Sequence, residues 1–196
     1  MIDERFVIVG AVLGFIGGMS YLVDTIKGKT QPNKVSWLLW AIAPLIAFYA
    51  EIKQGVGLPA LMTFMVGFNP LLIFFASFVN KKSQWKISKF DLFCGALSII
   101  GLILWQITQI GNLAILFAIL SDGLAGIPTI VKSYREPETE NYKVFLFGAI
   151  NAFITLLAIK EWNFAHYGFP IYIFLICLLL FLLIKFKLGK RLAKLS

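Results

Sequence analysis

The sequence IYIFLICLLLFLLI, at residues 171–184, is apolar from end to end and is followed by Lys185. Strands of a membrane β-barrel instead alternate apolar and polar residues over about 10 positions. In hydrocarbon, a helix pairs every backbone polar group within a single segment. The stretch therefore predicts a helix that crosses a membrane.

The same pattern recurs along the chain. Of the 196 residues, 59% are hydrophobic and 14% are charged, and the charges gather between the apolar runs. A helical span needs roughly 20 mostly apolar residues. The sequence thus predicts an all-α integral membrane protein with seven transmembrane helices, at residues 6–23, 35–50, 58–79, 90–105, 112–131, 142–159 and 168–184.

The basic residues predict the orientation of these helices. Arg5, Lys53 and Lys160 fall on the side of the N-terminus, and the other fifteen Lys and Arg residues fall on the opposite side. Because basic loops stay in the cytoplasm, we expect a multi-pass protein of the plasma (inner) membrane, with its N-terminus outside and its C-terminus cytoplasmic. The net charge of +8 then reflects this orientation and contact with the lipid bilayer, not binding to nucleic acid.

An internal repeat divides the chain. A shift of 105 residues places Lys27 on Lys132 and Pro32 on Pro137. This predicts a 3+1+3 arrangement of two parallel three-helix repeats, with the linker helix reversing the chain direction between them. The predicted units are 1–80, the linker 81–110, and 111–196 with its basic cytoplasmic tail. In transporters built from parallel repeats, the substrate lies near the middle of the membrane between them. A chance likeness between two membrane hairpins is the alternative.

The second of these hairpins carries a motif. The stretch PTIVKSYR at residues 128–135, followed by Thr139 and Glu140, is similar to a PQ-loop motif. In that motif a Pro-Gln pair precedes a basic turn and a Ser/Thr-Glu segment. The chain resembles a divergent SWEET or PQ-loop transporter, and it has the same 3+1+3 plan as the nicotinamide riboside transporters.

The resemblance implies a transporter but leaves its substrate open. Thr129 stands in place of the Gln, and Val23-Asp24 replaces the Pro-Gln pair in the first repeat. SWEETs present an asparagine from the third helix of each repeat to the sugar. Asn69 matches the first of these positions, and the seventh span contains no Asn.

Asp122 is the most informative position for function, because it lies near the middle of the fifth span. An ionised carboxylate there is costly, so we expect a protonated group or one that reaches water through a cavity. Asn69 and Asn151 lie at a similar depth and, with Trp40, complete the predicted substrate-binding set. Asp122 is also the predicted proton-coupling residue. The alternative is that these groups only join helices.

Four residues are predicted gates or hinges. Asp24 lies near the inner end of the first span, and Pro44, Pro70 and Pro128 interrupt later spans. Proline removes a helical hydrogen bond and can kink a helix. The alternatives are an ion pair of Asp24 with Lys27 and irregularities that the helices simply tolerate.

Five further side chains have less specific expectations. We expect Trp37 to be an aromatic anchor at the membrane surface and Glu51 to be solvated. His166 has no second His or Cys near it, so no metal site is predicted. Cys94 and Cys177 fall inside spans and should be free thiols.

No catalytic motif or cofactor signature is present, so an enzyme is not expected. The sequence predicts a transporter that moves a small polar solute, such as a sugar, an amino acid or a vitamin-like molecule, by alternating access. A non-transporting receptor or assembly scaffold is the alternative, and assembly into a homo-oligomer stays open.

Overall fold

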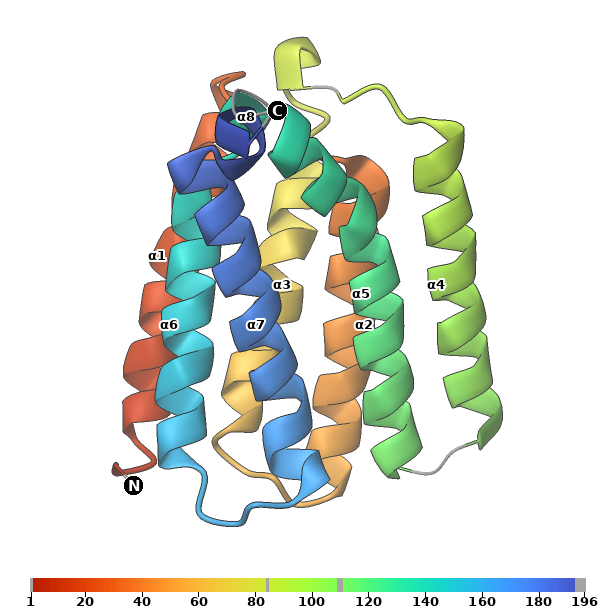
Figure 1. The fold of residues 1–196 in the computed structure, drawn as a ribbon. Coiled ribbons are helices and arrows are strands. Elements are labelled where there is room, and N and C mark those ends of the chain that lie inside the picture. The colour runs from red at the N-terminus through yellow and green to blue at the C-terminus, as the bar shows by residue number, and fades with distance from the viewer. Residues whose placement is uncertain (1, 84, 109–110, 193–196) are drawn as a thin grey trace.

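The computed structural model describes all residues except 1, 84, 109–110 and 193–196 (Figure 1). Every regular element among the described residues is helical, which confirms the all-α prediction. The elements are α1 (Phe6–Ile26), α2 (Lys34–Lys53), α3 (Ala60–Ala76), η1 (Lys81–Ser83), α4 (Lys89–Thr108), α5 (Gly111–Arg135), η2 (Pro137–Thr139), α6 (Tyr142–Ala158), α7 (Phe164–Phe186) and α8 (Leu188–Leu192). Lys194, one of the predicted basic residues of the tail, lies outside the described residues.

Each predicted span overlaps one of the helices α1 to α7, and α8 is absent from the prediction. Four of them, α1, α2, α5 and α7, are long and apolar enough to cross a membrane. Helices α3 and α6 are also apolar but have only 17 residues each. Helix α5 continues past the predicted end of its span to Arg135, which places Lys132 inside the helix.

The helices run side by side, and the same set of neighbours occurs twice (Figure 1). Helix α3 packs against both α1 and α2, and α7 packs against both α5 and α6. The two triplets meet where α1 packs on α6 and where α2 packs on α5. Helix α4 stands outside them and packs mainly on α5. Helix α4 therefore lies at the edge of the bundle.

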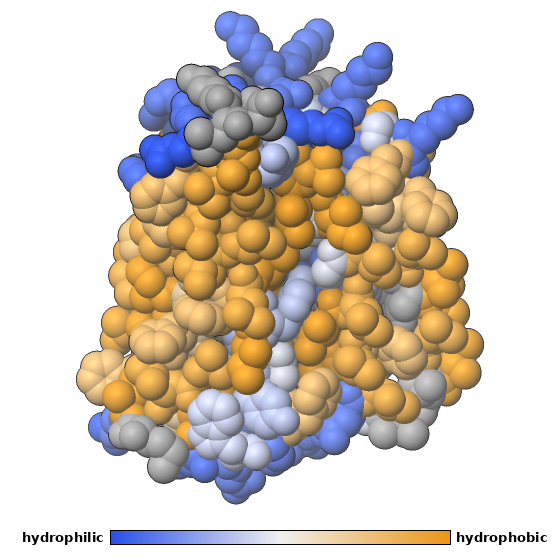
Figure 2. All heavy atoms as spheres, viewed as in Figure 1, coloured by the Kyte–Doolittle hydropathy of each residue, from blue (hydrophilic) through white to orange (hydrophobic). Residues whose placement is uncertain are grey.

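Figure 2 shows, on one face of the molecule, an apolar band across the middle and polar residues at the two ends. Large apolar side chains are exposed on the helices, among them Phe75 of α3 and Phe93 of α4, each 61% exposed. Soluble monomers rarely expose a continuous apolar surface of this extent. The lateral surface is therefore suited to lipid.

Glycines on one side of α1 allow two asparagines to approach its backbone. Asn69 of α3 donates from Nδ2 to the Gly14 carbonyl at 3.1 Å. A Cβ atom on Gly18 would lie 2.5 Å from Cγ of Asn69, and one on Gly10 would lie 2.6 Å from Oδ1 of Asn151. The absence of side chains at these glycines thus fixes the spacing of α3 and α6 against α1.

This close packing predicts that Gly18→Ala lowers the thermal stability of the purified protein, because the new methyl group would overlap the Asn69 amide. Overpacking of this kind costs about 1–3 kcal/mol. Gly123→Ala is the matched control, since its Cβ would meet nothing closer than 3.7 Å. Equal melting temperatures for the two variants would contradict this account of the α1 interface.

Candidate functional site

A cavity lies inside the bundle and is lined by residues of α1, α2, α3, α5, α6 and α7. Its volume is about 80 Å³, measured as the space that the centres of water molecules can reach. The four predicted substrate-binding residues, Trp40, Asn69, Asp122 and Asn151, all line it. The structure thus brings together side chains from four different helices that are far apart in the sequence.

Asp122 is 2% exposed and is held by two aromatic side chains. The Tyr172 hydroxyl of α7 donates to its Oδ2 at 2.6 Å. The Trp40 indole Nε1 of α2 donates to the Asp122 backbone carbonyl at 3.1 Å. The Asp122 Oδ1 atom has no hydrogen-bond partner among the described residues. One oxygen of the carboxyl group is therefore hydrogen-bonded to the protein, and the other has no such bond.

Of the two amides that line the cavity, Asn69 is partly hydrogen-bonded to the protein in the same way. Asn69 uses its Nδ2 to bind α1, as described above. The Oδ1 atoms of Asn69 and Asn151 are buried, and neither has a partner in the described part of the chain. Buried polar atoms in folded proteins are usually hydrogen-bonded, so unsatisfied ones need an explanation. With Oδ1 of Asp122, all three of these oxygens belong to residues that line the cavity.

Aromatic rings close the cavity toward the end of the bundle where α2 begins. The Trp37 ring lies 4.6 Å from that of Tyr21 and 5.4 Å from that of Trp40. The Trp40 ring lies 6.3 Å from that of Phe145. Trp37 is 1% exposed, so the prediction of a surface anchor was wrong. Its ring is buried because it faces α1 instead of the lipid.

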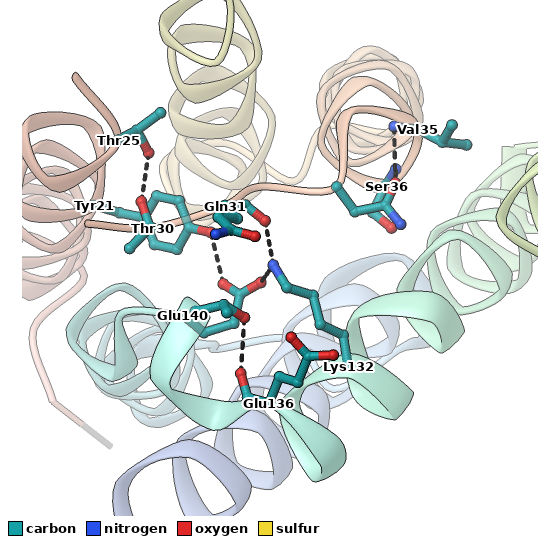
Figure 3. A network of polar contacts seen from close by, with 11 residues as sticks. Tyr21, Thr25, Thr30, Gln31, Val35, Ser36, Lys132, Glu136 and Glu140 are labelled. Carbon is teal, nitrogen blue, oxygen red and sulfur yellow. Dashed lines mark hydrogen bonds and ion pairs between the residues drawn. The ribbon is translucent and has the colours of Figure 1, made fainter. Parts of the chain in front are cut away.

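A buried ion pair lies next to this aromatic layer (Figure 3). Lys132 Nζ and Glu140 Oε1 are 2.7 Å apart, and their side chains are 1% and 0% exposed. The Tyr21 hydroxyl donates to Oε2 of Glu140 at 2.6 Å. Lys132 also donates to the backbone carbonyl of Gln31. These contacts tie α1 and the segment before α2 to the C-terminal turns of α5 and the segment before α6.

The predicted gate and hinge residues fall in different places. Asp24 accepts a hydrogen bond from Nδ2 of Asn141 at 2.6 Å, which joins α1 to the N-cap of α6. Pro44, Pro70 and Pro128 lie inside α2, α3 and α5. Of these residues, Pro70 alone lines the cavity.

Glu51 was expected to be solvated, and this prediction was wrong because the residue is 1% exposed. The Thr63 hydroxyl of α3 donates to its Oε1 at 3.0 Å, and Oε2 has no partner among the described residues. Ala43 and Ala47 lie on the same face of α2 at helical spacing. That row of small residues is the signal that places Glu51 toward α3.

Cys177 lines the cavity, whereas Cys94 is buried elsewhere, and both are free thiols. Within the described residues, no group of three or more His, Cys, Asp or Glu side chains could hold a metal ion. The chemistry that the cavity offers is therefore hydrogen bonding, aromatic contact and the titration of one carboxyl group.

Protein-family models, curated proteins and solved structures were compared with the chain, and none of them matches it. The resemblance to SWEET and PQ-loop proteins stays a prediction. Function therefore has to follow from the site and not from a fold name.

The buried ion pair predicts a strong effect on stability. Lys132→Met or Glu140→Gln alone should lower the free energy of unfolding by about 3–5 kcal/mol, since each leaves a buried charge unpaired. The double variant should lose less than the sum of the two. A double-mutant cycle from denaturant unfolding in detergent measures this coupling.

The exposed pair of Lys160 and Glu4 is the control, with side chains 68% and 31% exposed. Its cycle should give a coupling below about 1 kcal/mol. Similar coupling energies for the two pairs would contradict the buried role of Lys132.

Proposed function

We propose that this chain is a multi-pass transporter that moves a small polar solute across the plasma membrane by alternating access. The observation that carries the proposal is the cavity between the helices, with a carboxyl group and two amides on its wall. Ligand sites are commonly apolar cavities with a few converging polar groups. A receptor or scaffold would need only a dry, fully packed interior, so the cavity favours transport.

The helices are best interpreted as a 3+1+3 bundle of two parallel repeats. If α1, α2 and α3 are exchanged with α5, α6 and α7, the set of packed neighbours stays the same. An asparagine also caps the second helix of each triplet, Asn33 on α2 and Asn141 on α6. The cavity lies between the triplets, which is where transporters of this construction bind their substrates.

The solute should be rich in hydrogen-bond donors. The unpaired side-chain oxygens of Asn69, Asp122 and Asn151 are all acceptors. Hydroxyl or ammonium groups would satisfy them, and the rings of Trp40 and Phe145 would cover a less polar face. A sugar, an amino acid or a vitamin-like amine has this chemistry. A cavity of about 80 Å³ holds only a few water molecules, so binding of such a solute requires a more open conformation.

The aromatic layer and the ion pair behind it would form the cytoplasmic gate. Opening on that side requires the Lys132–Glu140 pair to separate, or to move as a unit away from Tyr21. Asp24, with its bond to Asn141, belongs to the same boundary between α1 and α6. Pro70 and Pro128 interrupt the helical hydrogen bonds of α3 and α5, where bending is easiest.

Asp122 is proposed to couple transport to protons. No basic side chain lines the cavity among the described residues. An ionised Asp122 would therefore lack a counter-charge in the closed state, which favours the protonated form there. When the cavity opens to water, the same group can release its proton. Tyr172 holds Oδ2 in place and leaves Oδ1 for the solute or the proton.

The proposed orientation predicts opposite labelling of two exposed positions. In a variant without native cysteines, Lys29→Cys should react with a membrane-impermeant maleimide only from the cytoplasmic side. Glu161→Cys should react only from the outside. Labelling of both positions from one side would contradict the orientation and the number of spans.

The proton-coupling role predicts a selective defect in Asp122→Asn. A thermal-shift screen of sugars, amino acids and vitamins first identifies a solute that stabilises the purified protein. In proteoliposomes, Asp122→Asn should then lose uptake driven by a pH gradient, because the amide cannot release a proton. Exchange of solute at equal pH should survive.

Glu51→Gln is the matched control, since Glu51 is a buried carboxyl group that does not line the cavity. It should keep pH-driven uptake. Full pH-driven uptake by a well-folded Asp122→Asn protein would end the proton-carrier hypothesis.

A further inference from the structure

A second and larger pocket lies at the end of the bundle that carries α8. Residues 85–91, which lead into α4, form one wall, and the last turns of α5 form the other. Its volume is about 470 Å³, measured in the same way as for the cavity. No residue lines both the pocket and the cavity. The pocket is therefore a separate site.

The pocket combines unpaired charges of both signs. Lys86, Arg135 and Glu136 line it, and all three are exposed. Among the described residues, none of these side chains takes part in an ion pair or a hydrogen bond. Two cations and a carboxylate thus share one pocket without neutralising one another. A ligand that carries both charges could bind all three.

The other two charged residues of the pocket already have partners within the protein. Asp91 is 4% exposed, and its Oδ2 accepts the backbone N–H of Ser88 at 2.7 Å, which caps the start of α4. Lys132 is paired with Glu140 and lies 4.6 Å from the centre of the Trp85 ring. These two residues therefore shape the pocket, and the ligand-facing charges are those of Lys86, Arg135 and Glu136.

The pocket adjoins an apolar surface. Phe90 lines it and is 47% exposed. Two nearby residues of α4, Leu92 and Phe93, are 59% and 61% exposed. Figure 1 shows that α4 stands at the edge of the bundle, and the segment before it lies at the same end as α8. In the proposed orientation this is the level of the cytoplasmic lipid headgroups. Acyl chains could lie along α4 while the headgroup enters the pocket.

We propose that this pocket binds a phospholipid whose headgroup contains a phosphate and a primary ammonium group, as in phosphatidylethanolamine. Lys86 and Arg135 would bind the phosphate oxygens through charge-assisted hydrogen bonds. The Glu136 carboxylate would accept hydrogen bonds from the ammonium group. A choline headgroup has no N–H donor for Glu136, and a glycerol headgroup has no positive charge. Lipid binding at this site requires a bilayer but not transport, so its test is independent of the proposed function.

Native mass spectrometry of the full chain tests the proposal with phosphatidylethanolamine, phosphatidylcholine and phosphatidylglycerol at equal concentrations. Phosphatidylethanolamine should bind most tightly to the unaltered protein. Lys86→Gln/Arg135→Gln should weaken its binding about tenfold, the loss expected when a charged hydrogen-bond partner is removed. Lys27→Gln/Lys29→Gln removes the same charge at exposed positions outside the pocket and should leave binding unchanged.

The Glu136→Gln variant distinguishes recognition of the ammonium group from a general electrostatic attraction between the basic residues and the lipid phosphate. It should abolish the preference for phosphatidylethanolamine over phosphatidylglycerol while phosphate binding persists. Equal binding of all three lipids to the unaltered protein, or equal weakening by both double variants, would overturn the proposal. Free phosphoethanolamine that binds as tightly as the lipid would also overturn it, because the ligand would then be a soluble molecule.

Discussion

The structure depends on how polar side chains are satisfied inside an apolar bundle. Away from water, each buried polar group needs a partner within the protein, and one left without a partner is costly. The pairs that meet this need join different helices: Lys132 and Tyr21 with Glu140, Tyr172 with Asp122, and Asn69 with the backbone of α1. These contacts fix the helices relative to one another more specifically than apolar packing could, because each requires a particular donor opposite a particular acceptor.

The same constraint applies to the ion pair and to the proposed site. At the end where α2 begins, both oxygens of Glu140 are bound, and aromatic rings fill the space beside them. Among the residues that line the cavity, hydrogen bonding is incomplete, because Asn69, Asp122 and Asn151 each keep one oxygen without a partner in the described part of the chain. A solute that donates hydrogen bonds would complete it. We interpret the cavity as the centre of the proposed function because three of the residues that line it keep such an oxygen.

Much of this arrangement follows from the sequence. Apolar runs predict the helices. The mid-span position of Asn69, Asp122 and Asn151 predicts that they face the interior, because a polar group at that depth is costly in lipid, and all three line the cavity. The orientation of single side chains was harder to predict. Trp37 and Glu51 lie near the ends of α2, where depth does not distinguish a buried face from an exposed one. Lys132 was counted as a loop charge, since only the fold shows that Glu140 reaches it. Tyr172 was missed because its partner Asp122 lies on another helix.

Native Cys177 offers the most direct test of the central claim, that the cavity opens in turn to the two sides of the membrane. It lines the cavity, and Cys94, which is buried outside it, can be replaced by Ala. The measurement is the reaction of Cys177 with a charged, membrane-impermeant thiol reagent added to one side or the other of sealed vesicles. Alternating access predicts reaction from both sides in separate experiments, and slower reaction once an identified solute is bound. Reaction from neither side, or from one side only, would contradict it.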